Sequence, residues 1–460
     1  MKPDKKSLRF ILSLLMFATL WPIQTLWPQT DDPYAVRRDA VIDRIGKAIA
    51  VIPAQIQSPR GAQENKDFFY LVGAMEPDAL LVLTGEGEKK HTLFNRSGKW
   101  TSGNPPTRLD VRPLTDLRMF FMRGSIGKAI HLPFTSLDGL LPALGGAVIL
   151  SQAAQLCNLE PILAEMRIVK SPEEIKTLQQ AIDITADAFI EVLKAAQPGM
   201  RELDLKAIFQ YTYVRREATE SFLQAASGPN SINIHFGATT RAMQAGDVIV
   251  FDLGAWFDRY TSDISRTIPV SGKFTKEQAE LYNVVLSAQK EGIKLMVPGN
   301  GIQMAQTAVE DALLQGLQKL GLVTDPASPW QRRLFIQHGF IHGIGLDVHD
   351  VWGWFSRQMR EGLTFKPGMV LTMEPGLYFP ADRLDKFQAG PRSQVPEEEW
   401  KTFVAKIGPI YKKYANLGCR IEDDILVTDA GNQVLTARAP KEIADIEKLM
   451  KLLSPFNQLK

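Results

Sequence analysis

The sequence predicts a mixed α/β protein in which a smaller α/β domain precedes a larger, internally duplicated α/β (α+β) domain. Its 460 residues suffice for two or three domains of roughly 100–200 residues each. Short apolar runs alternate with helical patterns in the first third, and a helix–Pro-Gly–helix unit then occurs twice, 100 residues apart. A hydrophobic content of 45% with 23% charged residues excludes the disordered and fibrous classes.

Residues 1–30 have the pattern of a targeting segment. A basic start with Lys2, Lys5 and Lys6 precedes a mainly apolar stretch from Leu8 to Ile23, which is short for a membrane span of about 20 residues. We expect a signal peptide, with an uncleaved N-terminal anchor as the alternative because no small-residue cleavage site follows. Both interpretations predict a secreted or periplasmic protein, attached to a membrane only if the leader is retained.

The region from residue 31 to 165 contains strand-like runs such as DALLVLTG and GAVILSQ between turn-rich stretches, which favours an α/β domain. It contains two isolated histidines, His91 and His131. No cluster of reactive side chains accompanies them, so we expect both to be structural.

The region from residue 166 to 455 begins with a pair of helices that recurs. Capping boxes at Ser171-x-x-Glu174 and Thr275-x-x-Gln278 predict two helix starts. Each helix ends near a Pro-Gly pair, and a further helical stretch follows each pair. This repetition predicts two related halves.

The strands that follow those helices repeat as well. The segments QAGDVIVFDLGA and KPGMVLTMEPGLY both match G-x-V-[IL]-x-x-[DE]-x-G, with Asp252 and Glu374 at the acidic position. Together with the helical repeat, the match predicts an internal duplication in which each half contributes one carboxylate from a buried strand.

A second aspartate, Asp263, follows Asp252 by eleven residues. A hairpin that turns near Phe257 and Asp258 would place the two aspartates directly opposite each other, with Cβ atoms about 4.5–5.5 Å apart. Carboxylates held this close in apolar surroundings repel unless a divalent cation balances their charge. The alternative is a pair of unrelated aspartates that cap turns.

Three of the six histidines, His338, His342 and His349, lie within HGFIHGIGLDVHDV. The i, i+4 spacing of the first two resembles a zinc-binding helix, but Gly339 replaces the expected glutamate and the glycines disfavour a helix. We therefore expect a glycine-rich loop or strand that directs imidazoles into a cleft. Downstream, GCRIEDDILVTDAG places Glu422 on a strand-like segment, for which a solvated strand edge is the alternative.

Other chemistries have little support in the sequence. It contains no phosphate-binding loop, dinucleotide fingerprint or nucleophile elbow. A net charge of +2 provides no basic surface for nucleic acid, and two cysteines, Cys157 and Cys419, cannot form a thiolate zinc site. Whether the two cysteines pair is left open.

The segments FDLGA, SDISRTIPV, HGIGLDVHD, MEPGLY and RIEDDI together resemble the metal-ligand motifs of the M24 metallopeptidase family, which has the pita-bread fold. The earlier segments YAVRRDAVIDRIGKAIAVIP and DFFYLVGAMEPDALLVL resemble the N-terminal domain of aminopeptidase P and the prolidases. The resemblance covers nearly the whole chain after the leader. It implies an N-terminal domain at 31–165 and a pita-bread catalytic domain at 166–455.

Transferred to this sequence, the resemblance implies that Asp252, Asp263, His342, Glu374 and Glu422 bind two divalent metal ions. Asp263 and Glu422 would bridge the ions, Asp252 would complete one site, and His342 with Glu374 would complete the other. Four carboxylates and one imidazole form a hard ligand set that suits Mn²⁺, with Zn²⁺, Co²⁺ and Fe²⁺ as alternatives.

The resemblance also implies a mechanism in which a water that bridges the ions attacks the peptide carbonyl as hydroxide. Glu374 would carry the proton to the leaving amine, and His235 and His349 would bind the substrate, stabilise the oxyanion and assist proton transfer. The other positions that match the family's substrate-binding residues are His338, Tyr378 and Arg420. A structural imidazole is the alternative for His338.

We therefore expect a Xaa-Pro aminopeptidase that acts on peptides with proline in second position, with a prolidase as the alternative and a non-catalytic peptide-binding protein as a third hypothesis. The sequence departs from the family in FGATTRAM after His235 and in the 48-residue interval between Glu374 and Glu422. We expect that interval to form an extra surface element near the cleft, which either limits substrate length or supports a homo-oligomer.

Overall fold

The computed structural model describes residues 32–58, 61–85, 89–124, 127–136, 155–351, 362–390 and 395–458. The expected targeting segment at 1–30 and the apolar run GAVILSQ lie outside these ranges. The chain divides into two compact units, Met1–Asn158 and Leu159–Lys460. Within the described ranges, no helix combines the length and the apolar character that a bilayer span requires.

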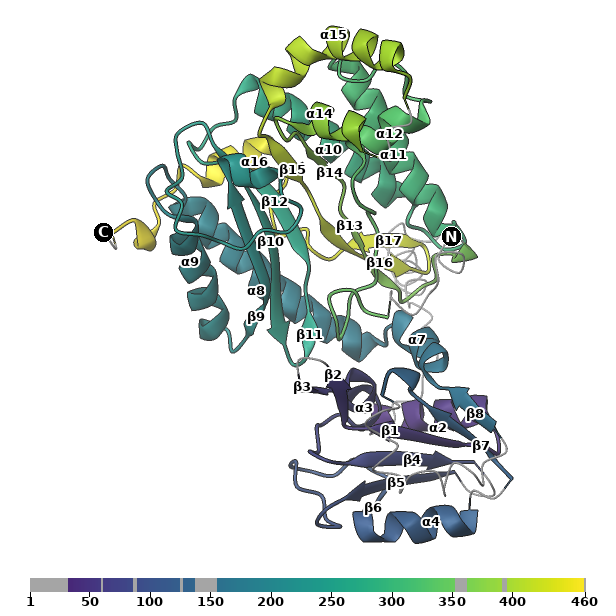
Figure 1. The fold of residues 1–460 in the computed structure, drawn as a ribbon. Helices are drawn as coiled ribbons and strands as arrows, with labels where there is room; N and C mark the ends of the chain where they lie inside the picture. The colour runs from purple at the N-terminus through teal and green to yellow at the C-terminus, as the bar shows by residue number, and fades with distance from the viewer. Residues whose placement is uncertain are drawn as a thin grey trace, which may run out of the picture. The chain divides into compact units, whose positions relative to one another are not determined.

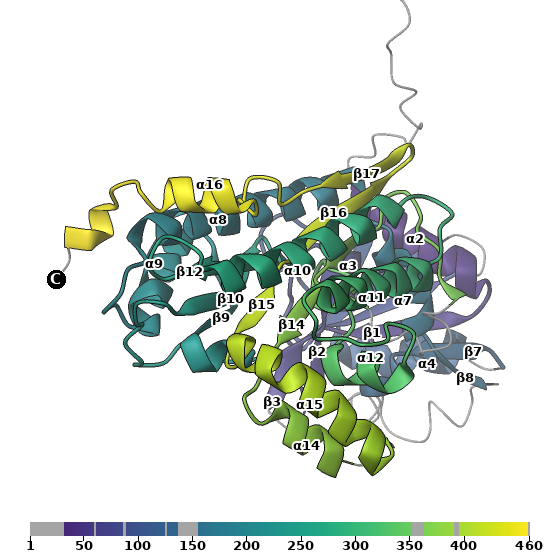
Figure 2. The same cartoon turned by 90° about the horizontal axis from the view of Figure 1, so that it is seen from above.

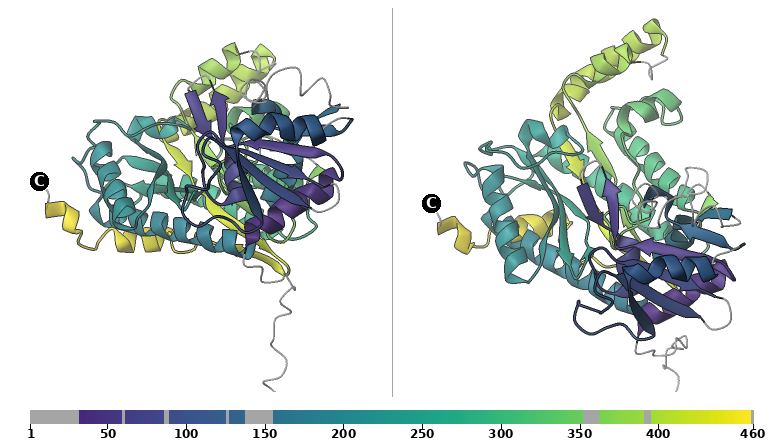
Figure 3. Two further views of the ribbon diagram at one scale, coloured as in Figure 1. Left: turned by 90° about the horizontal axis from the view of Figure 1, so that it is seen from below. Right: turned by 60° about the horizontal axis from the view of Figure 1, so that its bottom comes forward.

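The first unit is built around a six-stranded mixed sheet with the strand order β6-β5-β4-β1-β7-β8. Its elements are α2 (Pro33–Ile45), β1 (Ile49–Pro53), β2 (Gln55–Ser58), β3 (Gly61–Glu64), α3 (Lys66–Val72), β4 (Leu80–Thr84), β5 (Lys90–Asn95), β6 (Leu109–Pro113), α4 (Leu117–Gly124), β7 (Ala129–Leu132) and β8 (Gln155–Asn158). Alternate residues of β1 and β4, such as Val51 and Val82, pack against Phe121 of α4. Because side chains alternate along a strand, the intervening buried residues face the other side of the sheet, where α2 lies (Figure 3).

The first half of the second unit consists of a four-stranded sheet covered by two long helices (Figure 1). Its elements are α7 (Glu160–Ile168), α8 (Pro172–Ala195), α9 (Glu202–Arg215), β9 (Thr219–Ser227), β10 (Val248–Phe257), β11 (Tyr260–Thr261) and β12 (Ile264–Pro269). Phe251 of β10 packs edge-on against Phe189 of α8 and Phe209 of α9, with ring centroids 6.1 and 5.5 Å apart. This core fixes β10, and therefore Asp252, against the helices.

The second half repeats this plan with shorter strands (Figure 2). Its elements are α10 (Lys276–Leu295), α11 (Ile302–Lys319), α12 (Pro329–Phe335), β13 (Val370–Met373), β14 (Gly376–Tyr378), α14 (Arg383–Ala389), α15 (Glu397–Tyr414), β15 (Gly418–Arg420), β16 (Asp423–Thr428), β17 (Gly431–Val434) and α16 (Ile443–Leu449). Gly292 lets α10 approach β13 closely, because a Cβ atom there would lie 2.6 Å from the Met373 side chain. The two halves thus place β10 and β13 in matching positions beside their helix pairs.

Both predicted capping boxes are present, at Ser171 and Thr275. The turn after each long helix is also the same in both halves. Gly199 and Gly299 have φ values of +89° and +88°, and their amide groups donate to Met243 O and Phe365 O at 2.8 and 3.0 Å. Matching backbone bonds in segments with unlike side chains are what a duplicated supersecondary unit produces.

The hairpin between β10 and β12 differs from our expectation by one residue at its turn. Asp258 and Arg259 both have positive φ, as a two-residue type I′ turn requires, and Asp252 therefore pairs with Ser265 instead of Asp263. Shifting the turn by one residue moves each cross-strand partner by two. Because that shift is even, Asp263 stays on the same face of the sheet as Asp252.

The long interval between Glu374 and Glu422 forms the β14–β15 ribbon and two helices, α14 and α15, at its end. Trp400 and Phe403 of α15 pack against Trp330 of α12, with ring centroids 5.9 and 4.7 Å from the Trp330 ring. The inserted helices are therefore fixed to the second half by an aromatic cluster.

Candidate metal centre

The structure brings all five residues that were expected to bind metal to the wall of one pocket of about 280 Å³. Asp252 projects from β10, Asp263 lies between β11 and β12, and Glu422 lies between β15 and β16. Glu374 directly follows β13, and His342 belongs to an irregular segment. Each half of the duplicated unit thus contributes to a single site.

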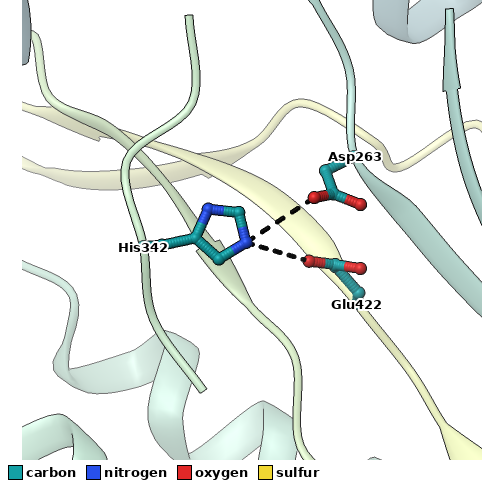
Figure 4. A group of neighbouring side chains, drawn as sticks. All are labelled: Asp263, His342 and Glu422. Atoms are coloured by element: carbon teal, nitrogen blue, oxygen red, sulfur yellow. Dashed lines mark ion pairs between the residues drawn. The ribbon is translucent and has the colours of Figure 1, made fainter. Parts of the chain in front are cut away.

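Asp263, His342 and Glu422 form the centre of this group (Figure 4). One ligand atom from each of the three lies within 4.8 Å of the others, and all three side chains are buried. His342 Nε2 is 3.6 Å from Asp263 Oδ2, 3.8 Å from Glu422 Oε1 and 3.3 Å from Glu374 Oε1. These separations leave room for a cation between the side chains.

His342 is positioned by a strand-like pairing with β13, since the glycine-rich segment is not helical. Thr372 N donates to His342 O at 2.9 Å, and Glu374 N donates to Phe340 O at 3.0 Å. The His342 ring nitrogen Nδ1 lies 3.0 Å from Gly343 O. A proton on Nδ1 in that contact leaves Nε2 as the nitrogen with a lone pair for a metal.

Arg420 and Ser265 organise the other side of the site. Arg420 Nη2 lies 2.7 Å from Asp252 Oδ2, and Arg420 Nε donates to Ser265 Oγ at 2.8 Å. Ser265 Oγ lies 3.0 Å from Asp252 Oδ1 and 2.8 Å from Glu422 Oε2. Because a hydroxyl has one proton, Ser265 can donate to one of these carboxylates at a time, and the other lacks that hydrogen bond.

The electrostatics of the site call for added positive charge. Burial, together with the charges of Glu422 and Asp252, raises the pKa of Asp263 well above its ordinary value. Burial and the charges of Glu374 and Asp252 do the same for the pKa of Glu422. Asp263 Oδ1 and Glu422 Oε1 are buried without a hydrogen-bond partner. Orphaned carboxylate oxygens in a hard, oxygen-rich ligand set fit divalent cations.

The residues expected to bind substrate lie around this group in two layers. His235, His349 and Arg420 line the pocket. Tyr378 and His338 lie behind Arg420, where Tyr378 Oη accepts a hydrogen bond from Arg420 Nη1 at 2.6 Å and lies 3.3 Å from His338 Nε2. Among the residues that the structure describes, none of α14 or α15 lines this pocket.

Several residues of the site were not anticipated from the sequence. Ser265 lies two residues after Asp263 on the same strand face, a period-2 signal that could have revealed it. Gln224 donates from Nε2 to Asp252 Oδ2 at 2.9 Å, although its position on β9 gives no hint of this in the sequence. Asp424 accepts a hydrogen bond from Asp263 N at 3.1 Å. The apolar residues on the pocket wall are Phe222, Ile234 and Val348.

Both cysteines are free thiols. Cys419 is buried on β15, where burial raises the pKa of its thiol to about 12. A thiol with so high a pKa is unreactive at neutral pH.

Comparison with known families agrees with this geometry. Residues 176–429 match the model of metallopeptidase family M24, and residues 34–102 match the aminopeptidase P N-terminal domain. The chain belongs to metallopeptidase family M24. The predicted fold class, a pita-bread catalytic domain preceded by a smaller α/β domain, is thereby confirmed, and membership of this family makes the chain a metal-dependent hydrolase.

The chain is 34% identical to a protein named Xaa-Pro aminopeptidase from Haemophilus influenzae, covering 84% of this chain and 88% of that protein. It is 32% identical to the Xaa-Pro aminopeptidase of Escherichia coli, covering 90% and 96%. A Xaa-Pro dipeptidase of Mus musculus is 31% identical over 64% of this chain and 62% of that protein.

Solved structures show the same M24 architecture. Aminopeptidase PepP of Pseudomonas aeruginosa superimposes with a TM-score of 0.76 at 28% identity, covering 91% of this chain and 97% of that one. Zinc-substituted E. coli aminopeptidase P in complex with product gives 0.74 at 31% identity, with the same coverage. These similarities extend over both units of the chain.

Proposed function

We propose that this chain is a Xaa-Pro aminopeptidase, which releases the N-terminal residue from peptides with proline in second position. The observation that carries the proposal is the convergence of four carboxylates and one imidazole from both halves of an M24 domain on one pocket. The nearly full-length similarity to Xaa-Pro aminopeptidases supports this substrate class. The dipeptidase alternative has weaker support, because the similarity to the mouse dipeptidase covers less of both chains.

In this proposal Asp252, Asp263, His342, Glu374 and Glu422 hold two divalent ions. When bound, the ions lower the pKa of a water molecule and polarise the scissile carbonyl. Mn²⁺ is the metal we propose, because oxygen donors dominate the ligand set. Asp263 and Glu422 each have a buried carboxylate oxygen without a hydrogen-bond partner, and both lie beside the His342 ring (Figure 4), so they are the two residues that would contact both ions.

Glu374 is the proposed proton carrier. Its side chain is the least enclosed of the five, with 17% of its surface exposed, and it lies on the pocket wall beside His342. The hydrogen bond and charge of His342 outweigh burial and lower the pKa of Glu374. In the metal-loaded site the charge of the bound cations would take the place of the His342 charge in keeping Glu374 ionised, and an ionised Glu374 could take a proton from the attacking water and pass it to the nitrogen of the leaving proline.

His235 and His349 are the proposed substrate-facing histidines, since both line the pocket and both side chains are exposed. Although the His349 side chain reaches solvent, surrounding protein atoms partly desolvate its ring, and this desolvation together with the nearby charge of His342 lowers the pKa of His349 in the metal-free protein. A neutral His349 can donate a hydrogen bond to the oxygen of the tetrahedral intermediate without carrying a charge into the free site. We propose that Tyr378, Arg420 and His338 shape the wall beyond the scissile bond.

Hydrolysis of the tripeptide Gly-Pro-Hyp, the dipeptide Gly-Pro and the control Gly-Ala-Hyp tests this proposal after reconstitution of the metal-free chain with Mn²⁺, Co²⁺ or Zn²⁺. We expect release of glycine from Gly-Pro-Hyp and little from Gly-Ala-Hyp, with Mn²⁺ giving the highest rate. Cleavage of the dipeptide alone would show that the protein is a prolidase. No hydrolysis with any of the metals would favour the non-catalytic alternative.

A pair of aspartate variants on one hairpin checks the assignment of ligands. Asp263→Asn should abolish turnover and reduce the bound metal by at least one equivalent, as measured by atomic absorption. Asp258→Asn in the exposed turn of the same hairpin should retain both. Full turnover by the Asp263 variant would remove that residue from the metal site.

For the N-terminal segment we propose export from the cytoplasm, which fractionation of cells that express the full chain would test.

A further inference from the structure

The segment that carries His235 is tied at both ends to one buried carboxylate, that of Glu202 at the start of α9. Glu202 Oε1 accepts hydrogen bonds from Ser227 N and Oγ at 2.8 and 2.7 Å and from Asn230 Nδ2 at 3.1 Å. Glu202 Oε2 accepts from Thr239 N and Oγ1 at 2.9 and 2.6 Å. Each carboxylate oxygen thus holds one end of the segment between Ser227 and Thr239, which we name the His235 loop.

Glu202 is suited to this task because it is a buried anion. Its side chain is fully buried. Burial alone would raise its pKa, but the hydrogen bonds from Thr239, Ser227 and Asn230 outweigh that effect and lower the pKa below its ordinary value. Hydrogen bonds to an ionised acceptor are short and strong. The carboxylate is therefore a firm link between the two ends of the loop.

The tip of the loop makes two contacts that lead directly to the metal site. Phe236 N donates to Gln224 Oε1 at 2.6 Å, and Ile234 O accepts from Arg420 Nη1 at 3.1 Å. Gln224 and Arg420 are also the two side chains that contact Asp252 Oδ2. His235 lies between these two tip contacts, which connect its neighbours in the chain to the side chains around Asp252.

The other half of the repeat shows that the helix start does not need a carboxylate. Ile302 occupies the first position of α11, as Glu202 does in α9. Ile302 N donates to Leu363 O at 2.9 Å, and Glu202 N donates to Arg241 O at 3.1 Å. Since the same backbone turn forms around an isoleucine, the carboxylate of Glu202 serves the His235 loop and not the turn.

We propose that Glu202 is a positioning residue for the reaction, which fixes the two ends of the His235 loop and thereby holds His235 in the pocket. Closing a loop at its base removes much of the conformational freedom of the residues inside it. The effect on turnover rests on the proposed function of His235, whereas the effect on the loop does not.

A double-mutant cycle tests this inference in the metal-loaded full chain. Glu202→Gln keeps the size of the side chain but places an NH₂ group against donors, so it breaks at least one end of the clamp. We expect Glu202→Gln to lower kcat/KM for Gly-Pro-Hyp at least tenfold with unchanged metal content. In the His235→Ala background the same substitution should change kcat/KM less than twofold, because the residue through which it acts is gone.

Amide hydrogen exchange provides a readout that is independent of catalysis. Glu202→Gln should speed exchange within residues 228–239 at least tenfold while the strands β10 and β12 keep their protection. Glu202→Asp, which retains the charge, should recover part of the wild-type protection. If Glu202→Gln does not fold, Thr239→Ala carries the same test, since it removes one donor at the trailing end of the loop.

Glu76→Gln is the matched control. Glu76 is a buried carboxylate of the first unit that accepts hydrogen bonds from Thr101 N and Ser102 N at 2.7 and 2.9 Å. It should leave kcat/KM and the exchange of residues 228–239 unchanged. The inference would be overturned if Glu202→Gln left kcat/KM unchanged or left the exchange of residues 228–239 unchanged. It would also be overturned if the loss of kcat/KM caused by Glu202→Gln were as large in the His235→Ala background as in the wild type. If the wild-type chain hydrolyses none of the peptides, the proposed function fails, and exchange alone decides whether Glu202 holds the loop.

Discussion

Asp350, the residue after His349, is buried between two cations, and replacing it with asparagine should destabilise the second unit strongly. Lys170 Nζ lies 2.9 Å from Asp350 Oδ2, and Arg167 donates to Oδ1. The side chains of Arg167, Lys170 and Asp350 are 5%, 1% and 2% exposed. Asp350→Asn keeps the shape of the side chain and removes its charge, which takes away the buried counter-ion that Lys170 and Arg167 share, although Arg167 keeps its contact with the more exposed Asp347.

Breaking a buried ion pair on one side costs about 3–5 kcal/mol, because the remaining charge stays buried and uncompensated. The charges of Arg167 and Lys170 outweigh burial and lower the pKa of Asp350 below its ordinary value of 3.8. The stabilisation is therefore fully present above about pH 4 and is lost as the pH falls through the lowered pKa of the folded state. The difference between wild type and variant should accordingly shrink in strong acid.

Guanidinium unfolding of both proteins at pH 7 and pH 3 measures these differences in the free energy of unfolding. Asp347→Asn is the control, because Asp347 contacts the same Arg167 at 3.3 Å but is 46% exposed. An exposed pair contributes about 0–1 kcal/mol. A loss below about 1 kcal/mol for Asp350→Asn, or one equal to that of the control, would refute the account of this buried charge cluster.

Three further predictions concern the metal site and the first unit. Glu374→Gln should lower kcat by several orders of magnitude with the circular dichroism spectrum unchanged, because metal binding and proton transfer are affected together; near-normal turnover would remove Glu374 from its role. His91→Ala should leave turnover unchanged yet lower the melting temperature of the first unit, since the buried His91 contacts Arg38 and Asp39; a large loss of turnover would contradict this. Removing metal with a chelator should abolish activity and lower Tm. In the metal-free protein the charges of Glu374 and Glu422 outweigh burial and raise the pKa of His342 from 6.5 to about 9. The protonated His342 therefore contributes about 3 kcal/mol to the free energy of unfolding below pH 6.5, and this contribution should be lost as the pH rises through 9. Added Mn²⁺ should abolish that pH dependence, and a metal-free Tm that does not fall between pH 6 and 9 would contradict this origin of the pKa.

Short sequence motifs predicted the secondary structure well where it is determined by interactions between residues that are near each other in the chain. Capping boxes fix where α8 and α10 begin, because the Ser171 and Thr275 side chains satisfy amide groups of their own first turn. The glycines of the His342 segment correctly predicted a non-helical conformation. The predicted position of the hairpin turn was wrong by one residue. The turn residues are Asp258 and Arg259, and neither is the glycine that normally marks a type I′ turn in a sequence.

The site itself was predicted in part. Asp252 and Glu374 could be found because the duplication repeats their surroundings, and the histidines because they cluster in the sequence. Gln224 and Glu202 could not be found in the same way. Their roles depend on contacts between segments that are far apart in the chain, such as the 25 residues that separate Glu202 from Ser227.

The sequence by itself determined the duplicated α/β architecture, the family and the identity of the five candidate ligands, because each depends on residues within short motifs. The tertiary structure decided which oxygens lack a partner, which charges Arg420 balances and which carboxylate holds the His235 loop. Those properties arise from burial and from the distances between side chains of the two halves. Neither burial nor these distances exist until the strands have paired and the loops have closed. Asp263 illustrates the difference: its motif marks it as a candidate ligand, and only the fold encloses it with Glu422 and His342 in a pocket that calls for a cation.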